Sequence, residues 1–177
     1  AIKYLRVGGQ SCICANRIYV QETIYDTFTA KLASKVKDMK VGAGDEDGVV
    51  IGPLINQRGL EKVQEHVADA LKKGGTLICG GRTHPAGPLF YEPTIITGMT
   101  PDMVLAGEET FGPVAGLFKF RDEGDVIAQA NETRYGLAAY FYSNDLGQCF
   151  RVAEALECGM VGINEPLLAT EVAPFGG

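Results

Sequence analysis

The chain is 177 residues long, with 46% hydrophobic residues, 21% charged residues and a formal net charge of −6 at pH 7. This length and composition are typical of one soluble globular domain with a single core. The acidic residues are scattered and no basic stripe could neutralise phosphates, so we expect no nucleic acid partner. Apolar runs fall well short of the roughly 20 residues of a membrane helix, and no signal-peptide segment opens the chain. We therefore expect a cytoplasmic protein with no membrane partner.

The five cysteines, at positions 12, 14, 79, 149 and 158, are an odd number. They lack the paired spacing of a zinc site and the density of a secreted disulfide scaffold, so we expect free thiols in a reducing compartment and no metal. The cysteine-bearing segment begins soon after the N-terminus, and residues 174–177 are typical of a turn that leads onward. We therefore expect this chain to be a piece of a longer protein.

The hydrophobic pattern predicts strands alternating with helices. Residues 16–20 are β-branched and aromatic enough for a strand, and apolar residues recur at three- and four-residue steps over 25–39, which predicts an amphipathic helix. The glycine-rich stretch 41–56 is expected to be a surface loop. A second helix is predicted over residues 60–71, because its apolar residues share one face and two glycines follow its end.

The rest of the chain continues the alternation. The expected strands are residues 76–79, 94–97, 114–120, 138–142 and 160–163. The expected helices are residues 122–131, with Asp122 as N-cap, and residues 146–156. This pattern favours an α/β fold: an open, mostly parallel twisted sheet with helices on both faces.

The segment Gly8–Arg17 places Cys12 after two glycines, in backbone that can turn sharply and let a ligand come close. By itself this is weak support for a nucleophile, because most free cysteines are small buried hydrophobic residues. His66 lies in a helical pattern and His84 in a loop, and neither has a context that marks the base of a cysteine protease. The residues alone leave Cys12 open between a nucleophile and a core residue.

Two further segments could contact a ligand. Residues 107–113 place paired carboxylates beside an aromatic residue and a Gly-Pro turn, although adjacent acids are usually a solvated surface pair. Residues 164–177 are typical of an irregular tail. No Gly-x-Gly-x-x-Gly pattern follows a strand, so a dinucleotide would have to be bound mainly by something outside this chain.

Five segments together resemble the aldehyde dehydrogenase superfamily, in its order and at its spacing. They are Gly-Gln-Ser-Cys at 9–12, Ile-Gly-Pro-Leu-Ile at 51–55, Glu-Glu-Thr-Phe-Gly-Pro at 108–113, Tyr-Gly-Leu-Ala at 135–138 and Pro-Phe-Gly-Gly at 174–177. The resemblance covers residues 1–177 as the family's catalytic domain, with an N-terminal cofactor-binding domain and a C-terminal oligomerisation arm absent. Residues 12–17, 138–142 and 172–175 look closest to the succinate-semialdehyde dehydrogenase branch.

The resemblance implies that Cys12 is the catalytic nucleophile. Its thiolate would attack the aldehyde carbon to give a thiohemiacetal, which loses hydride to the nicotinamide and becomes a thioester that water hydrolyses. The backbone N–H of Cys12 would help to stabilise the oxyanion. An oxyanion asparagine, a general-base glutamate and most of the dinucleotide surface would lie outside this chain, so we expect the chain alone to be inactive.

The resemblance also implies how ligands are held. Glu109 matches the glutamate that binds the nicotinamide ribose hydroxyls, a role that suits an acceptor-only carboxylate. Phe111 and Phe175 match aromatic residues that line the nicotinamide and substrate pocket. Arg6 matches the arginine that grips the substrate carboxylate, which suits a guanidinium.

The chain departs from the family pattern beside these residues. Next to Arg6, Val7 and Gly8 replace the commoner asparagine followed by a small residue. Thr170 stands where relatives have a serine that donates to the substrate carboxylate. Threonine keeps the hydroxyl and adds a methyl group, which changes the shape of the pocket.

The implied function is oxidation of succinate semialdehyde to succinate, as in 4-aminobutyrate degradation, with NAD or NADP as hydride acceptor. A homodimer or homotetramer is implied for the longer protein. The substrate could instead be glutarate semialdehyde or another ω-semialdehyde, because one methylene is worth only about 1–3 kcal/mol of discrimination. Less favoured alternatives are a thiol redox protein without nicotinamide and a non-catalytic assembly module.

Cys14 is a candidate redox partner of Cys12. In an extended segment, Cα atoms two residues apart lie about 7 Å from each other, near the upper limit for a disulfide. We hypothesise that an oxidised Cys12–Cys14 pair would be an inactive state, as some relatives of the family suggest.

Overall fold

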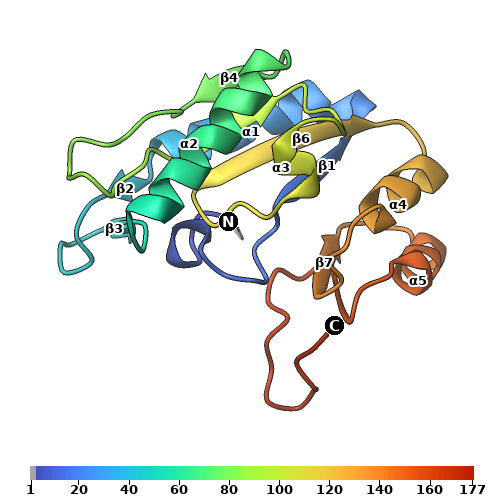
Figure 1. Cartoon of the computed structure of the whole chain (residues 1–177). Coiled ribbons are helices and arrows are strands. Elements are labelled where there is room, and N and C mark those ends of the chain that lie inside the picture. The colour runs from blue at the N-terminus through green and yellow to red at the C-terminus, as the bar shows by residue number, and fades with distance from the viewer. Residues whose placement is uncertain (1–2) are drawn as a thin grey trace. The chain divides into compact units, whose positions relative to one another are not determined.

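The computed structural model describes residues 3–177 and forms two compact units, which meet in the sequence between Lys119 and Phe120 (Figure 1). The first unit contains the largest sheet and the helices that pack on it. The second contains further helices and a two-stranded sheet. A single catalytic domain over residues 1–177 stays a prediction.

The first unit is built on a four-stranded sheet with the strand order β1-β6-β5-β4. Its strands are β1 (Arg17–Gln21), β6 (Val114–Phe120), β5 (Thr94–Thr97) and β4 (Thr76–Cys79). β5 and β6 pair in parallel, with Ile95 opposite Ala115, whereas β4 runs antiparallel to β5. The residues of β5 are all β-branched, which suits a strand buried between two layers.

Alternate residues of the central strand β6 enter two separate cores. Val114 and Phe118 belong to one buried cluster. Ala115 and Leu117 belong to the other. Because successive side chains point to opposite faces of a strand, the two clusters lie on opposite faces of the sheet.

Helices cover both of these faces. On one side lie α2 (Gln57–Lys72) and α3 (Val104–Gly107), and on the other lies α1 (Tyr25–Lys37). The buried stripe of α2 recurs at three- and four-residue steps, as an amphipathic helix requires; it consists of Leu60, Val63, Val67 and Ala70. The predicted fold, an open and mostly parallel α/β sheet with helices on both faces, is confirmed.

The loop predicted for residues 41–56 was wrong in part. It contains β3 (Val49–Ile51), which pairs in parallel with β2 (Lys40–Val41). Ile51 is 1% exposed and packs in the α1-side cluster, a burial that a short glycine-flanked segment does not reveal by periodicity. Three short helical segments were also not predicted: η1 (Val7–Gly9), η2 (Glu22–Ile24) and α3.

The second unit contains α4 (Glu123–Asn131), β7 (Ala138–Phe141), α5 (Leu146–Ala155) and β8 (Met160–Ile163). β7 and β8 pair in parallel, and both helices begin at an aspartate whose side chain accepts a backbone hydrogen bond. The predicted cap Asp122 is confirmed, since it accepts from the Asp125 amide at 2.9 Å. Among residues 3–177, no helix is long and apolar enough to cross a membrane.

We predict that Leu117→Ala lowers the free energy of unfolding by about 2–5 kcal/mol, because it opens a cavity in the α1-side core. Leu117 is 0% exposed, whereas Leu77 on the edge strand β4 is 39% exposed. The matched change Leu77→Ala should cost about 1 kcal/mol or less. Urea unfolding followed by circular dichroism measures both, and equal losses would contradict the burial assigned to Leu117.

Candidate active site

Cys12 is exposed and lies within a tight turn. The turn runs from Ser11 to Cys14, whose backbone N–H donates to the Ser11 carbonyl at 2.9 Å. The hydrogen bond that closes the turn uses the amide of Cys14 and not the amide of Cys12. Because Cys12 is exposed, the alternative that it is a small buried core residue is wrong.

A close backbone contact holds this turn against the 108–113 segment. Gly9 has a φ of 83°, and a Cβ on it would lie 2.1 Å from the carbonyl oxygen of Gly112. Gly112 is itself confined, because a Cβ there would lie 2.4 Å from the side chain of Val63 on α2. Only glycine permits these approaches, so two of the family motifs pack backbone to backbone.

Gln10 ties the same turn to the 51–55 motif. Its side-chain nitrogen donates to the carbonyl of Pro53 at 3.1 Å, and its side-chain oxygen accepts from the amide of Ile55 at 2.9 Å. An amide side chain suits this position because it donates and accepts at once. Three family motifs therefore meet beside Cys12 in the first unit.

Val7 lies where the chain departs from the family pattern, and its backbone is strained. Its φ of 48° is in the left-handed region that β-branched residues avoid, and asparagine tolerates that region better. Its side chain is 72% exposed, so packing compensates little of this cost. The departure therefore places a strained residue in the segment that leads to the turn containing Cys12.

Arg6 is partly buried, and its carbonyl oxygen accepts two hydrogen bonds. Its carbonyl oxygen accepts from the Gly9 amide at 2.9 Å and from the Cys14 thiol at 3.8 Å. The backbone of Arg6 is thus joined to the segment that carries Cys12. Its grip on a substrate carboxylate stays a prediction.

Cys14 is only 6% exposed, and burial raises the pKa of its thiol although the charge of Lys3 opposes the shift. The extended segment assumed between Cys12 and Cys14 was wrong, because both residues lie in a turn that brings its ends together. A buried thiol with a raised pKa forms less thiolate and reacts more slowly with oxidants. The Cys12–Cys14 redox pair stays a prediction.

Glu109 and Phe111 flank the buried Thr110 and reach the surface. Glu109 is partly buried, which raises the pKa of its carboxyl, while the charges of Lys3 and Lys62 oppose that shift. Phe111 is 42% exposed. A hydrogen-bond acceptor beside an exposed ring fits a ribose joined to a flat nicotinamide, although these roles stay predictions.

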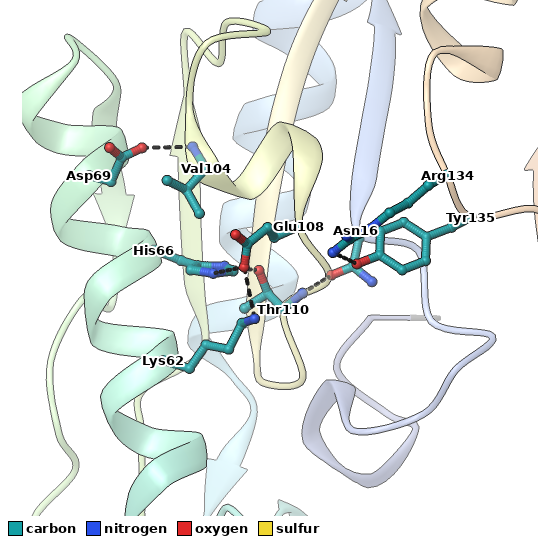
Figure 2. Close-up of polar contacts among 9 residues, drawn as sticks. All are labelled: Asn16, Lys62, His66, Asp69, Val104, Glu108, Thr110, Arg134 and Tyr135. Atoms are coloured by element: carbon teal, nitrogen blue, oxygen red, sulfur yellow. Dashed lines mark hydrogen bonds and ion pairs between the residues drawn. The ribbon is translucent and has the colours of Figure 1, made fainter.

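Every polar group of Thr110, which is 0% exposed, has a partner. Its N–H donates to Asn16 Oδ1 at 2.9 Å, and its carbonyl accepts from Lys3 Nζ at 2.7 Å. Its hydroxyl lies 2.7 Å from His66 Nδ1. Figure 2 shows Asn16 and His66 pointing toward Thr110. We call Lys3, Asn16, His66 and Thr110 the Thr110 clasp.

Glu108 extends these contacts to the surface. Its carboxylate lies 2.9 Å from Lys62 Nζ and 3.7 Å from His66 Nε2 (Figure 2). The Lys62–Glu108 pair is about half exposed, so it contributes little stability. Burial, helped by the charge of Lys62, lowers the pKa of His66 despite the nearby carboxylates. His66 is therefore neutral at pH 7.

Sequence reasoning missed Lys3, Asn16 and His66. Lys3 is 2% exposed, and burial lowers its pKa to about 8, while the charges of Cys14 and Glu109 act in the opposite direction. A lysine near the start of a chain is usually solvated, and His66 is an ordinary polar residue in a helical pattern. The only available signal was that Asn16 falls within the 12–17 segment of the family resemblance.

The second unit carries the remaining candidates, Thr170 and Phe175, both exposed on an irregular tail. Within this unit the 135–138 and 174–177 motifs meet, because a Cβ on Gly177 would lie 2.5 Å from the Gly136 carbonyl. The other candidates, Arg6, Cys12, Glu109 and Phe111, lie in the first unit. The substrate roles of the two tail residues stay predictions.

The chain matches the model of the aldehyde dehydrogenase family over residues 3–177. It belongs to the aldehyde dehydrogenase family. It is 54% identical over 172 residues to an NADP(+) succinate-semialdehyde dehydrogenase of Escherichia coli K12, covering 97% of this chain and 36% of that protein. It is 51% identical over 176 residues to a glutarate-semialdehyde dehydrogenase of Pseudomonas aeruginosa, covering 99% and 36%.

Solved structures agree with this membership. The crystal structure of succinate-semialdehyde dehydrogenase from Burkholderia pseudomallei matches 99% of this chain and 36% of that one, with a TM-score of 0.98 and 55% identity. The predicted likeness to the succinate-semialdehyde branch of the aldehyde dehydrogenases is confirmed. The chain spans about 36% of the length of these relatives.

We predict that Gly9→Ala destabilises this aldehyde dehydrogenase chain by more than about 2 kcal/mol, because the methyl group would collide with the Gly112 carbonyl in a backbone conformation unsuited to alanine. Gly44 serves as the matched site, because a Cβ there would meet nothing within 4 Å. Gly44→Ala should change the free energy of unfolding by less than about 1 kcal/mol. Thermal unfolding compares the two, and similar midpoints would contradict the close approach.

We predict that His66 makes the folded state of this aldehyde dehydrogenase chain more sensitive to acid than that of the His66→Asn variant. Its pKa is lowered in the folded state, so below about pH 6.5 the unfolded chain binds the proton more readily and acid favours unfolding. The stability difference between the wild type and His66→Asn should therefore shrink as the pH falls from about 7.5 to 5. Chemical unfolding at several pH values measures this difference; parallel curves would rule out the contribution of His66.

Proposed function

We propose that this chain is the catalytic-domain part of a longer aldehyde dehydrogenase that oxidises succinate semialdehyde to succinate, with NAD or NADP as hydride acceptor. One observation carries the proposal: an exposed cysteine on a turn that is held by family motifs on both sides. Relatives named for succinate and glutarate semialdehyde support a short aldehyde with a carboxylate at its far end.

Cys12 supplies the covalent chemistry in this proposal. Its thiolate adds to the aldehyde carbon, forming a carbon–sulfur bond and an oxyanion that the Cys12 backbone N–H stabilises. Collapse of the oxyanion releases hydride from that carbon and leaves a thioester. A nicotinamide cofactor, which we propose that Glu109 and Phe111 help to hold, would supply the acceptor for this hydride. Water then cleaves the carbon–sulfur bond of the thioester, which gives the carboxylic acid and the Cys12 thiol, and loss of the thiol proton restores the thiolate.

Glu109 and Phe111 are the residues of this chain that we propose to hold the cofactor. The partly buried carboxylate of Glu109 would accept hydrogen bonds from two ribose hydroxyls, because an ionised carboxylate can accept at both of its oxygens. The charges of Lys3 and Lys62 favour that ionised form against the cost of burial. Phe111, with its ring 42% exposed, would offer an apolar surface to the nicotinamide.

Arg6 is proposed to hold the distal carboxylate of the substrate by paired hydrogen bonds, with the Thr170 hydroxyl as a further donor and Phe175 as an apolar wall. The general base, the oxyanion asparagine and most of the dinucleotide surface would belong to the rest of the protein. For that reason we expect the isolated chain to be inactive. We propose a cytoplasmic homodimer or homotetramer for the whole enzyme.

Glutarate semialdehyde is the second candidate substrate, and the similarity to an enzyme named for it favours this alternative. The two aldehydes differ by one methylene, so the pocket discriminates between them by only about 10- to 200-fold. Comparing kcat/KM across aldehydes of increasing chain length decides between them.

We predict that the full-length enzyme reduces NAD or NADP much faster with succinate semialdehyde than with propanal, which lacks the carboxylate. Cys12→Ala should lower kcat by more than about 10³-fold, as removing a covalent nucleophile does in other enzymes. Arg6→Ala should lower the ratio of kcat/KM for succinate semialdehyde to kcat/KM for propanal by about 10- to 100-fold, as expected for the loss of a charged hydrogen-bonded pair. The steady-state rise in absorbance of the reduced nicotinamide follows each rate.

Matched controls keep this experiment specific. Cys79→Ala removes a partly exposed thiol on β4, and Arg58→Ala removes an exposed arginine on α2; both should retain wild-type rates. If propanal reacts as fast as succinate semialdehyde, the proposed substrate is wrong while the aldehyde dehydrogenase chemistry stands. If Cys12→Ala retains turnover, the proposed nucleophile is wrong.

A further inference from the structure

The Thr110 clasp connects the nucleophile segment to the segment that carries Glu109. Asn16 lies two residues after Cys14, and its side-chain nitrogen donates to the Cys14 carbonyl at 3.4 Å. On its other side, Asn16 Oδ1 accepts from the Thr110 amide at 2.9 Å. One asparagine side chain therefore bridges the backbone next to the nucleophile turn and the backbone next to Glu109.

Lys3 closes the clasp from a third direction. Its ammonium donates to Asn16 Oδ1 at 3.0 Å and to the Thr110 carbonyl at 2.7 Å. These two bonds hold both the side chain of Asn16 and the peptide that follows Thr110. Among the buried side chains of residues 3–177, no nitrogen or oxygen atom is left without a partner, so each buried polar side chain of the clasp has at least one hydrogen bond.

Burying this lysine is costly, which argues against a purely space-filling role. Lys3 is 2% exposed, and desolvation lowers its pKa to about 8, so burial works against the charged form. An apolar side chain would occupy the same volume without that cost. What an apolar residue could not do is donate to Asn16 and to the Thr110 carbonyl while placing positive charge near Glu109.

We propose that Lys3 and Asn16 are positioning residues for the cofactor: by fixing the backbone of Thr110, they hold the Glu109 carboxylate at a set place relative to Cys12. This inference rests on the proposed function, in which Glu109 binds the nicotinamide ribose. It assigns a task to two residues to which the proposed function gives no contact with the aldehyde or the cofactor.

The physical consequence concerns affinity for the cofactor. If Asn16 loses its oxygen, the buried Thr110 amide has no acceptor, and the backbone must shift to reach water or another partner. Glu109 is the adjacent residue, so its carboxylate moves with that peptide. The hydrogen bond from the Cys14 amide to the Ser11 carbonyl, which closes the turn around Cys12, does not involve Asn16, so we expect that turn to be kept.

The test compares Asn16→Leu, which removes the oxygen, with Asn16→Asp, which keeps an acceptor for both Thr110 and Lys3. In the full-length enzyme, we predict that Asn16→Leu weakens binding of NADH or NADPH by about ten-fold, as expected for an unsatisfied buried amide, whereas Asn16→Asp stays within about three-fold of the wild type. Fluorescence titration of the reduced cofactor measures both. Alkylation of Cys12 by iodoacetamide should proceed within about two-fold of the wild-type rate in each variant.

Asn131→Leu is the matched control for lost stability. Its side chain bonds the Ala155 carbonyl at 2.8 Å and the Glu157 amide at 3.0 Å, both within the second unit. This variant should lower the melting temperature and leave cofactor affinity unchanged. If Asn16→Leu does not give folded protein, Lys3→Met replaces it, because Asn16 then still bonds the Thr110 amide while the Thr110 carbonyl loses its Lys3 donor and keeps only the Gly112 amide.

Two results would overturn the inference: wild-type cofactor affinity in Asn16→Leu and Lys3→Met, or an equal loss of affinity in Asn131→Leu. Binding is measured without turnover, so the proposed reaction is judged separately. An enzyme that binds the reduced cofactor and oxidises no aldehyde would refute the proposed function, and the affinities of the variants would still decide whether the clasp positions Glu109.

Discussion

The backbone contact between Gly9 and Gly112 is the constraint on which the rest of the first unit's candidate site depends. Neither residue can carry a Cβ in this arrangement, because one would meet a carbonyl oxygen at 2.1 Å and the other a Val63 methyl at 2.4 Å. The contact fixes the segment that leads to the Cys12 turn against the 108–113 segment, which leads into β6, a strand buried on both faces. Rigid positioning of a reactive group on a well-packed sheet is what covalent catalysis requires.

Around that contact, polar groups set the orientation of the two segments. Gln10 bonds the 51–55 motif on one side, and Asn16 and Lys3 bond Thr110 on the other. Apolar packing alone would leave the turn free to slide, since dispersion has little directional preference. Hydrogen bonds with fixed geometry remove that freedom, at the cost of burying a lysine. The site thus combines close glycine packing for proximity with buried polar bonds for direction.

Much of the fold followed from the sequence because its signals are local. Asp122 could be recognised as a cap from its neighbours, and the buried stripe of α2 from its spacing. The strand that contains Ile51 could not, because its burial comes from tertiary packing of a short segment. The same limit applies to Lys3, whose partner Thr110 lies 107 residues away. Cys12 itself was ambiguous on chemistry alone, and only the combination of five motifs indicated its role.

On the proposed roles, the groups that bind the substrate differ in how tightly they are held. Arg6 is joined through its carbonyl to Gly9 and Cys14, so a change in its backbone would disturb the turn that contains Cys12. Thr170 and Phe175 are exposed on an irregular tail outside both core clusters of the first unit. Exposed loop residues can change with little loss of stability. On these proposed roles, a grip of Arg6 on a distal carboxylate would be coupled through the backbone to the turn that contains Cys12, whereas the exposed side chains of Thr170 and Phe175 are not tied to that turn by any hydrogen bond described within residues 3–177.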